Sequence, residues 1–258
     1  MSTFHDRSWV RFPPEASVAS WIDSVLPAAA ATVANPANAA RIRCGGTWFV
    51  GVNALPNAPD GSVAGGPPLS GAAMAFLRRD LKLDPVALDR GQVSVCYQGY
   101  PQPMAEESEA AFRFRRDRDA AHVDGLIGEG PGKRRFIREP HSFIIGIPLC
   151  DVSPGMSPLV VWEGSHEIMR RAFARALGDH PPSAWGDVDL TDSYRAARQE
   201  VFATCRRVEV ITSFGECYIV HRLALHGVAP WGDPKSKERP VIYFRPLLDD
   251  LRSWLFAP

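Results

Sequence analysis

Short apolar runs separated by turn residues dominate the chain from Gly91 onward. Runs of four to eight residues that are rich in valine, isoleucine and aromatic side chains, and that are bounded by turn residues, are typical of β-strands. We therefore predict eight strands, at residues 92–97, 112–116, 134–137, 142–149, 159–162, 208–211, 217–221 and 241–245. Many short strands of this kind indicate a β-sandwich or a β-barrel.

Helical periodicity precedes these strands and interrupts them twice. Apolar residues recur at helical spacing early in residues 17–40, which predicts a helix there that is interrupted at Pro27 and Pro36. Three further helices are predicted at residues 70–81, 167–177 and 191–205. We expect Ser70 and Thr191 to cap the first and the last of these three helices.

A strand and a loop are expected between the first two helices. Residues 47–52 form an apolar run typical of a strand, whereas residues 53–70 are dense in glycine, proline, asparagine and aspartate and predict an extended surface loop. No repeat and no long linker divides the chain, so we expect a single domain over residues 1–258.

This order of elements predicts a β-rich fold with flanking helices. Within that class we expect a double-stranded β-helix core, which is the jelly-roll or cupin-like arrangement. Strand propensity by itself does not distinguish this core from other sandwiches.

The composition mainly argues against nucleic acid and membrane as partners. Apolar residues make up 45% of the chain, and Lys+Arg and Asp+Glu number 29 each. With no net charge we expect no nucleic-acid partner and no membrane partner. No segment approaches the about 20 apolar residues of a membrane span, and five cysteines without a Cys-x-x-Cys pair indicate free thiols. The expected location is cytoplasmic.

The first candidate metal site is His122-Val123-Asp124. Residues i and i+2 of an extended segment project to the same side, so an imidazole nitrogen and a carboxylate oxygen can reach one cation. The same pattern also suits a surface turn with a solvated aspartate, so the pair indicates a metal site only if a third ligand accompanies it. Residues 125–132 follow the pair, and we interpret them as a loop placed to cover the site.

A third ligand is available after the apolar run that follows Gly215. His221 and His226 both follow this run, and the glycine after His226 favours His226. Two histidines and one carboxylate leave three positions of an octahedral Fe(II) open, enough for a bidentate cosubstrate and dioxygen. A structural zinc site would require a fourth protein ligand.

Arg239 follows thirteen residues after His226, just before the strand predicted at 241–245. Its guanidinium fork is suited to binding a terminal carboxylate bidentately inside a barrel. The alternative interpretation is an exposed arginine at a strand end, beside Glu238.

Taken in order, these residues resemble the phytanoyl-CoA dioxygenase family of Fe(II)- and 2-oxoglutarate-dependent oxygenases. The resemblance covers roughly residues 90–246 and rests on His122-Val123-Asp124, on residues 149–152 leading to 163–166, on Gly215-Glu216 leading to His226-Gly227, and on Arg239. It implies a jelly-roll core, with His122, Asp124 and His226 as catalytic iron ligands and Arg239 as the partner of the C5 carboxylate of 2-oxoglutarate. It also implies hydroxylation of a small molecule by dioxygen, with release of succinate and CO2.

Two positions depart from the pattern that members of this family often show. Val228 stands where many members have a serine that binds the cosubstrate carboxylate, and Tyr243 is a candidate replacement. Glu163 stands where a proline is usual. The resemblance implies a structural role for His166, with Ser165 capping the following helix.

The substrate is less well indicated than the cofactors. Eight cations flank the candidate ligand pair and favour an anionic small molecule, namely Arg113, Arg115, Arg116, Arg118, Lys133, Arg134, Arg135 and Arg138. Carboxylates interleave with them, and the alternation of Phe112 and Phe114 with arginines also suits a half-buried strand. Three residues before the pair are candidates for substrate or cosubstrate contacts: Tyr97, Gln98 and Tyr100.

Two other function classes remain open. A redox-inert, metal-dependent isomerase or lyase of cupin type would use similar ligands, but it has no need of Arg239 in the pocket. A non-catalytic jelly-roll binding protein would keep the barrel but would not need a complete set of metal ligands.

Overall fold

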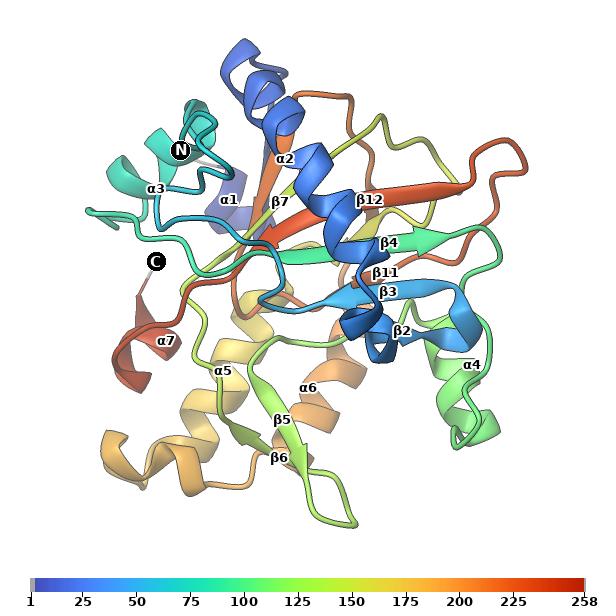
Figure 1. Ribbon diagram of the computed structural model, residues 1–258. Coiled ribbons are helices and arrows are strands. Elements are labelled where there is room, and N and C mark those ends of the chain that lie inside the picture. Colours follow the sequence, from blue (N-terminus) through green and yellow to red (C-terminus); the bar gives the residue numbers. More distant parts are fainter. Residues whose placement is uncertain (1–2, 258) are drawn as a thin grey trace.

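Two antiparallel β-sheets lie face to face at the centre of the protein, in a computed structural model that describes residues 3–257 (Figure 1). The seven-stranded sheet has the order β1 (Trp9–Phe12), β10 (Cys217–Val220), β7 (Ile144–Pro148), β12 (Glu238–Phe244), β4 (Gln92–Tyr97), β3 (Trp48–Gly51) and β2 (Ile42–Arg43). The three-stranded sheet has the order β11 (His226–Val228), β8 (Leu159–Trp162) and β9 (Arg207–Val210). A separate hairpin consists of β5 (Leu126–Glu129) and β6 (Arg134–Ile137).

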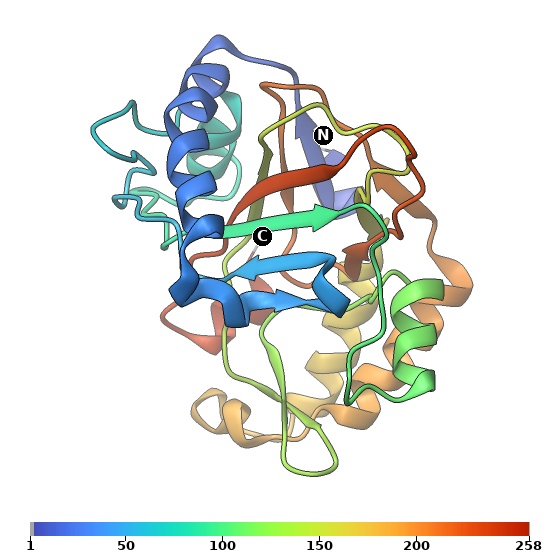
Figure 2. The ribbon, with the colours of Figure 1, turned by 45° about the vertical axis from the view of Figure 1, so that its right-hand side comes forward.

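Helices cover the outer faces of both sheets (Figure 2). The helices are α1 (Thr3–Arg7), α2 (Ala16–Ala34), α3 (Ala72–Arg79), α4 (Glu109–Asp117), α5 (Ser165–Leu177), α6 (Thr191–Thr204) and α7 (Leu251–Phe256). Three 3-10 turns lie at Pro36–Arg41, Cys44–Gly46 and Pro182–Asp187. Helices α2 and α3 share a core with the large sheet, and α5, α6 and α7 share another with β8. The result is a layered helix–sheet–sheet–helix arrangement.

The central strands read as continuous apolar runs because both of their faces are buried. In β8, Val161 packs between the two sheets while Val160 packs under α5 and α6. In β12, Tyr243 faces the space between the sheets while Ile242 faces α2. This alternation fixes which side chains of β12 point into the barrel, and the site described below depends on it.

The predicted β-rich fold with flanking helices is confirmed. The strands predicted at residues 92–97, 134–137 and 159–162 match β4, β6 and β8, and the helix predicted at 191–205 corresponds to α6. The loop predicted at residues 53–70 contains no helix and no strand longer than an isolated bridge. All five cysteines are free thiols, as expected.

The strand predicted at residues 112–116 is wrong, because this segment lies in α4. The Ser108 side chain caps the helix by accepting a hydrogen bond from the Ala111 amide, and Glu109 and Arg113 form an i,i+4 pair on its surface. The alternation of aromatic and basic residues misled the strand prediction. Residues 125–132 are likewise not a loop, since they contain β5 and the turn into β6.

Helix α2 differs from its prediction in two respects. It continues through Pro27, whose position on the exposed face leaves the freed carbonyl oxygen of Asp23 open to water. It is also long and apolar enough, by length and composition, to span a membrane, which contradicts the expectation that no segment is. In the structure its buried residues, Trp21 and Ile22 among them, pack against the seven-stranded sheet, as in the core helix of a globular protein.

Three predicted helix caps are wrong, and for two of them another side chain accepts a hydrogen bond from the first backbone amide of the helix. The Glu15 carboxylate, not Ser70, accepts the hydrogen bond of the Ala72 amide at the start of α3. Thr191 is the first residue of α6, and its amide donates to Asp189 Oδ1 at 2.9 Å. Ser165 begins α5 without capping it.

Candidate metal centre

Backbone pairing brings two distant histidines together. His122 follows α4 and lies in a short bridge to His226, the first residue of β11. The His122 amide donates to the His226 carbonyl at 2.8 Å, and the His226 amide donates to the His122 carbonyl at 3.0 Å. The two imidazole rings are 4.6 Å apart between centroids. Segments about a hundred residues apart in sequence therefore present neighbouring imidazoles.

The close approach of these two segments depends on Gly227. A Cβ atom at this position would lie 2.1 Å from the carbonyl oxygen of Asp119, which accepts a hydrogen bond from the Val228 amide. The Asp119 carboxylate is in turn held by two hydrogen bonds from Arg207 of β9, at 2.7 and 2.8 Å. This ion pair anchors the segment that carries His122.

Replacing Gly227 by alanine is expected to lower the free energy of unfolding by about 1–3 kcal/mol, because the new methyl group must displace backbone. The same displacement separates the two histidines, so affinity for divalent metal should also fall. Gly132→Ala is the matched control, since a Cβ there would meet nothing closer than 3.7 Å. Chemical denaturation and metal titration measure both effects, and an alanine at position 227 that changes neither contradicts the arrangement.

Ser165 supports the backbone next to His226 through a hydrogen bond. Its hydroxyl oxygen accepts a hydrogen bond from the Leu225 amide at 2.8 Å, one residue before His226. Ser165 is fully buried. The serine that sequence reasoning assigned to a helix cap thus stabilises the strand that carries the distal histidine.

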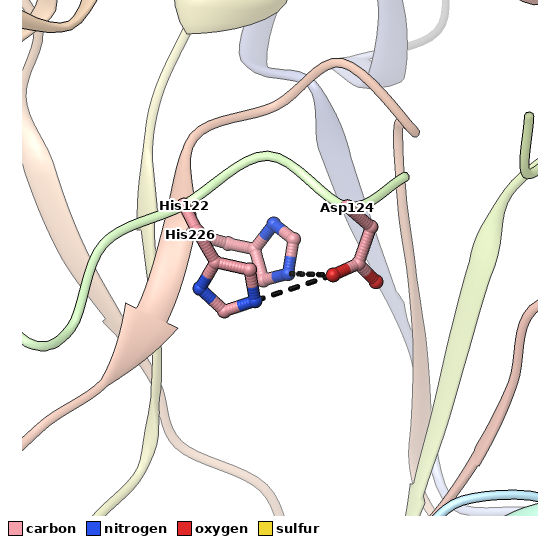
Figure 3. Close-up of side chains that lie close together, drawn as sticks. All are labelled: His122, Asp124 and His226. Carbon is pink, nitrogen blue, oxygen red and sulfur yellow. Dashed lines mark ion pairs between the residues drawn. The ribbon is translucent and has the colours of Figure 1, made fainter. Parts of the chain in front are cut away.

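Three potential ligand atoms converge at this point, from His122, Asp124 and His226, all within 4.8 Å of one another (Figure 3). Asp124 Oδ1 lies 3.2 Å from His122 Nε2 and 3.8 Å from His226 Nε2. At metal–ligand distances of about 2.1 Å, two ligands at right angles are about 3.0 Å apart. The observed separations therefore fit one cation bound by all three groups.

Hydrogen bonds fix the tautomer of both imidazoles. His122 Nδ1 lies 2.9 Å from the Ala120 carbonyl oxygen, and His226 Nδ1 lies 3.0 Å from the Ala224 carbonyl oxygen. A carbonyl oxygen only accepts, so Nδ1 carries the hydrogen in both rings. Both Nε2 lone pairs are left to bind a metal, which is the usual arrangement for metal-ligating histidine.

Asp124 and His226 are in the charge states that cation binding needs at neutral pH. Burial alone would lower the pKa of His122, but its hydrogen bond to Asp124 raises this pKa, so metal binding competes with a proton on that ring. Burial alone would raise the pKa of Asp124, but Arg245 and His122 hold it well below its ordinary value. Burial and the neighbouring His122 lower the pKa of His226 to about 4. At pH 7 the carboxylate is ionised and His226 is neutral, as metal ligation requires.

Arg245 is a site residue that the sequence analysis missed. Its Nη1 donates to Asp124 Oδ2 at 3.0 Å, and its Nη2 donates to Gln92 Oε1 at 2.7 Å. These bonds occupy one carboxylate oxygen and leave Oδ1 facing the two histidines. The available signal was strand alternation, because Arg239, Tyr243 and Arg245 lie at alternate positions that place their side chains on one face of β12.

Replacing Arg245 by glutamine removes the arginine that pairs with Asp124. We expect the metal-free variant to lose about 3–5 kcal/mol of stability, because a buried carboxylate is left without this cation. Added Mn(II) should stabilise the variant more than the wild type, since the metal then supplies the missing charge. Denaturation with and without Mn(II) measures this, with Arg116→Gln as the exposed-arginine control, and equal metal-induced stabilisation in variant and wild type would contradict the role given to Arg245.

Arg239 is buried rather than exposed at a strand end. It is 1% exposed, and its Nη2 lies 3.3 Å from Cys96 Sγ. Its Nε has no hydrogen-bond partner, and no carboxylate of residues 3–257 lies within 4.0 Å of its guanidinium. A buried cation without a counter-charge is costly, so this interior position suits an anion that binds from outside the chain.

A cavity of about 420 Å³ adjoins the candidate ligands. The lining includes all three candidate ligands, together with Trp48 and Val50 of β3, Ser94 of β4 and Tyr243 of β12. The Tyr243 hydroxyl accepts a hydrogen bond from Tyr218 at 3.1 Å. Arg239 lies four residues from Tyr243 on the same face of β12, but it is not among the residues that line the cavity.

Several other candidates lie away from this cluster. His221 and His166 are buried against each other, with ring centroids 4.8 Å apart, and neither belongs to the ligand cluster. Tyr97, Gln98 and Tyr100 do not line the cavity, although Gln92 and Ser94 of the same strand do. Val228, at the position of the family serine, does line it.

Comparisons with known proteins give structural matches only. The sequence matches no protein-family model and no curated protein. Similar solved structures include the non-heme alpha ketoglutarate dependent carbocyclase SnoK from nogalamycin biosynthesis, at 12% identity and a TM-score of 0.52, covering 94% of this chain and 81% of that one. AviO1 from Streptomyces viridochromogenes Tue57 matches at 13% identity and a TM-score of 0.48, covering 95% and 92%. EctD from S. alaskensis with bound Fe matches at 14% identity and a TM-score of 0.45, covering 94% and 74%.

The chain shares the fold of SnoK. That fold is the cupin-like jelly roll, which confirms the double-stranded β-helix core expected from the sequence. At 12% identity the match shows the fold alone. The chemistry must therefore be argued from the residues of the site.

Proposed function

We propose that this protein is an Fe(II)- and 2-oxoglutarate-dependent oxygenase that hydroxylates a small molecule. The observation that carries the proposal is the convergence of His122 Nε2, Asp124 Oδ1 and His226 Nε2. Two histidines and one carboxylate are the ligand set of non-haem Fe(II) oxygenases. The order of the motifs along the chain leads us to place it near the phytanoyl-CoA dioxygenase family.

Arg239 supports 2-oxoglutarate as the cosubstrate. The cosubstrate has a second carboxylate at the end opposite its keto acid group, and Arg239 is a buried guanidinium that lacks a carboxylate partner among residues 3–257. Val228 offers no hydrogen bond where the family often has a serine. The Tyr243 hydroxyl, which lines the cavity on the Arg239 face of β12, is the group we propose in its place.

Each protein group has a defined task in the proposed reaction. When bound, iron would supply the activation of dioxygen; 2-oxoglutarate would supply two of the four electrons that reduce dioxygen, leaving as succinate and CO2, and the substrate C–H bond would supply the other two as it becomes C–OH. His122, Asp124 and His226, which all line the cavity, would hold the metal. Arg245 keeps Asp124 ionised and oriented. The apolar walls, such as Val50 and Leu159, exclude water from the reacting centre.

A redox-inert isomerase or lyase of cupin type is the alternative enzyme class. It would use the same three ligands, but it gives no reason to bury Arg239 without a counter-charge. A non-catalytic binding protein gives no reason to keep three ligands with aligned tautomers. The buried arginine therefore favours the oxygenase.

Succinate formation tests the proposed function. Protein supplied with Fe(II), 2-oxoglutarate, ascorbate and air should convert 2-oxoglutarate to succinate in a metal-dependent manner, even slowly without its substrate. An isomerase or a binding protein forms no succinate. A protein that binds metal and 2-oxoglutarate but forms no succinate would therefore contradict the proposed oxygenase function and favour an isomerase or a binding protein.

We also propose a soluble, cytoplasmic protein that binds a small-molecule substrate and dioxygen, with no nucleic-acid or membrane partner. The five free thiols suit a reducing compartment. The packing of α2 against the sheet supports a soluble fold.

A further inference from the structure

The eight cations that flank the candidate ligand pair in sequence have very different surroundings. Five of them form ion pairs with nearby carboxylates, namely Arg113, Arg115, Arg116, Arg134 and Arg138. The Arg118 guanidinium stacks over the Phe202 ring at 4.9 Å. Lys133 lies in the turn of the β5–β6 hairpin. Arg135 is the member of this set that lines the cavity beside the metal centre.

Arg135 has a guanidinium that no carboxylate neutralises. Its Nη1 donates to the Leu126 carbonyl oxygen at 3.0 Å, and no carboxylate of residues 3–257 lies within 4.0 Å of it. This single bond leaves the edge formed by Nε and Nη2 available. That edge is the fork that binds a carboxylate through two parallel hydrogen bonds.

The position of Arg135 relative to the metal ligands is fixed by the hairpin. Arg135 lies opposite Gly128 in the β5–β6 register, and its guanidinium leans back along β5 to Leu126. Leu126 follows Asp124 by two residues, so their Cα atoms are within about 8 Å of each other. The Arg135 amide donates to Thr191 Oγ1 at 2.8 Å, which ties the strand to α6. The cation is therefore held close to the reacting centre.

Among residues 3–257, the remainder of the cavity lining offers no second free arginine or lysine. Arg245 also lines it, but its guanidinium is already bonded to Asp124 and Gln92. Apolar side chains make up most of the wall nearest the opening, including Val52 of the β3–α3 connection and Ile127 of β5, which are 38% and 40% exposed. The lining also includes Glu139, whose carboxylate lies 3.4 Å from His141 Nε2. A ligand that enters here therefore meets apolar surface, one unpaired guanidinium and a carboxylate that already has a histidine neighbour.

We propose that the substrate is a carboxylate with an apolar body, and that Arg135 binds its carboxylate while the body lies against Trp48, Val52 and Ile127. This inference rests on the proposed oxygenase function and names the substrate class of the same site. Arg135 is here a specificity-determining residue. With its carboxylate on Arg135 and its apolar body against the apolar wall, the substrate would present a C–H bond of the body to the candidate metal ligands. The carboxylate would point away from them.

Matched pairs of probes test this inference. The probes are butyrate, octanoate, phenylacetate and 4-phenylbutyrate, each compared with its neutral primary amide. Binding is measured by ligand-observed NMR on anaerobic protein loaded with Zn(II) and saturating 2-oxoglutarate, so that Arg239 is already occupied. The wild type is compared with Arg135→Gln, Arg135→Lys and the matched control Arg134→Gln. Arg134 is the neighbouring hairpin arginine, which pairs with Asp189 and does not line the cavity.

We expect the wild type and Arg134→Gln to bind at least one carboxylate about 10- to 100-fold more tightly than its amide. Arg135→Gln should abolish this preference, and Arg135→Lys should retain only part of it, because an ammonium lacks the fork. A wild type with no carboxylate preference across the panel, or an Arg135→Gln variant that keeps it, overturns the inference.

The binding of 2-oxoglutarate separates this outcome from failure of the proposed function. All four proteins should bind 2-oxoglutarate with equal affinity, because Arg135 has no role in holding it. If all four proteins bind 2-oxoglutarate equally and the wild type shows no preference for the carboxylate probes, the proposed substrate class is wrong. The proposed oxygenase function is not affected by that result. A wild type that fails to bind 2-oxoglutarate in the presence of metal overturns both.

Discussion

Replacing Asp124 by alanine is expected to reduce Fe(II)-dependent conversion of 2-oxoglutarate at least about 100-fold, since changes beyond the direct ligands already cost 10- to 100-fold. The substitution removes the carboxylate of the candidate ligand cluster found among residues 3–257. It also leaves Arg245 without its ion-pair partner, which is expected to cost about 3–5 kcal/mol of stability. Succinate formation and metal affinity at 15 °C measure the first effect in protein that remains folded.

Asp124→Asn separates the two consequences of this change. An asparagine keeps an oxygen that accepts the hydrogen bond of Arg245 but not the opposite charge, so the loss of stability should be smaller than in the alanine variant. Its amide is neutral, so it binds a divalent cation much more weakly than a carboxylate does. Wild-type metal affinity and turnover in the alanine variant would contradict the assignment of Asp124 as a ligand.

Replacing Arg239 by methionine is expected to have two opposite effects. Without ligands the variant should be about 1–4 kcal/mol more stable than the wild type, because an apolar side chain takes the place of a buried charge that lacks a carboxylate partner among residues 3–257. Its affinity for 2-oxoglutarate should fall at least about 30-fold, because the residue that we propose as the buried partner of the C5 carboxylate is lost. Thermal unfolding and 2-oxoglutarate titration measure the pair of effects.

Arg239→Lys is the charge-matched control for this variant. The lysine keeps the cation but lacks the guanidinium fork, so we expect intermediate 2-oxoglutarate affinity and no gain in stability. Metal affinity should be unchanged in both variants, since Arg239 is not one of the three clustered ligands. A methionine variant that is less stable than the wild type and still binds 2-oxoglutarate normally would show that Arg239 has a purely structural role.

The sequence predicted the barrel well where burial on both faces made the strands continuous apolar runs. The β8 segment, Leu159–Trp162, could be located from composition alone, because a strand covered on both faces leaves no polar position to interrupt the pattern. Propensity failed at α4, where alternating phenylalanine and arginine lie on a partly exposed helix. There the capping by Ser108 and the pair of Glu109 with Arg113 favour the helix.

The candidate ligands could be predicted because two of them are local and the third stands beside an informative glycine. His122 and Asp124 share one short segment, and Gly227 marks the close backbone approach beside His226. The groups that support the ligands could not be predicted in this way. Ser165 and Arg245 act through contacts across the sheets, and only the folded register brings them to the site.

The same limit applies to the substrate. The eight flanking cations look equivalent in the sequence, and only the ion pairs formed after folding distinguish them. Most are neutralised by carboxylates that are close in space, such as Asp189 for Arg134, 55 residues away. Arg135 differs by its orientation toward the cavity, which the hairpin register determines.

An anaerobic titration with Fe(II) and 2-oxoglutarate, followed by ultraviolet–visible spectroscopy, tests the central claim most directly. Chelation of the cosubstrate to iron held by His122, Asp124 and His226 predicts a weak charge-transfer band in the visible region that saturates at one iron per chain. The band should be absent in Asp124→Ala and should require far more 2-oxoglutarate in Arg239→Met. A wild-type protein that forms no band, or an alanine variant that forms it as readily, would contradict the account.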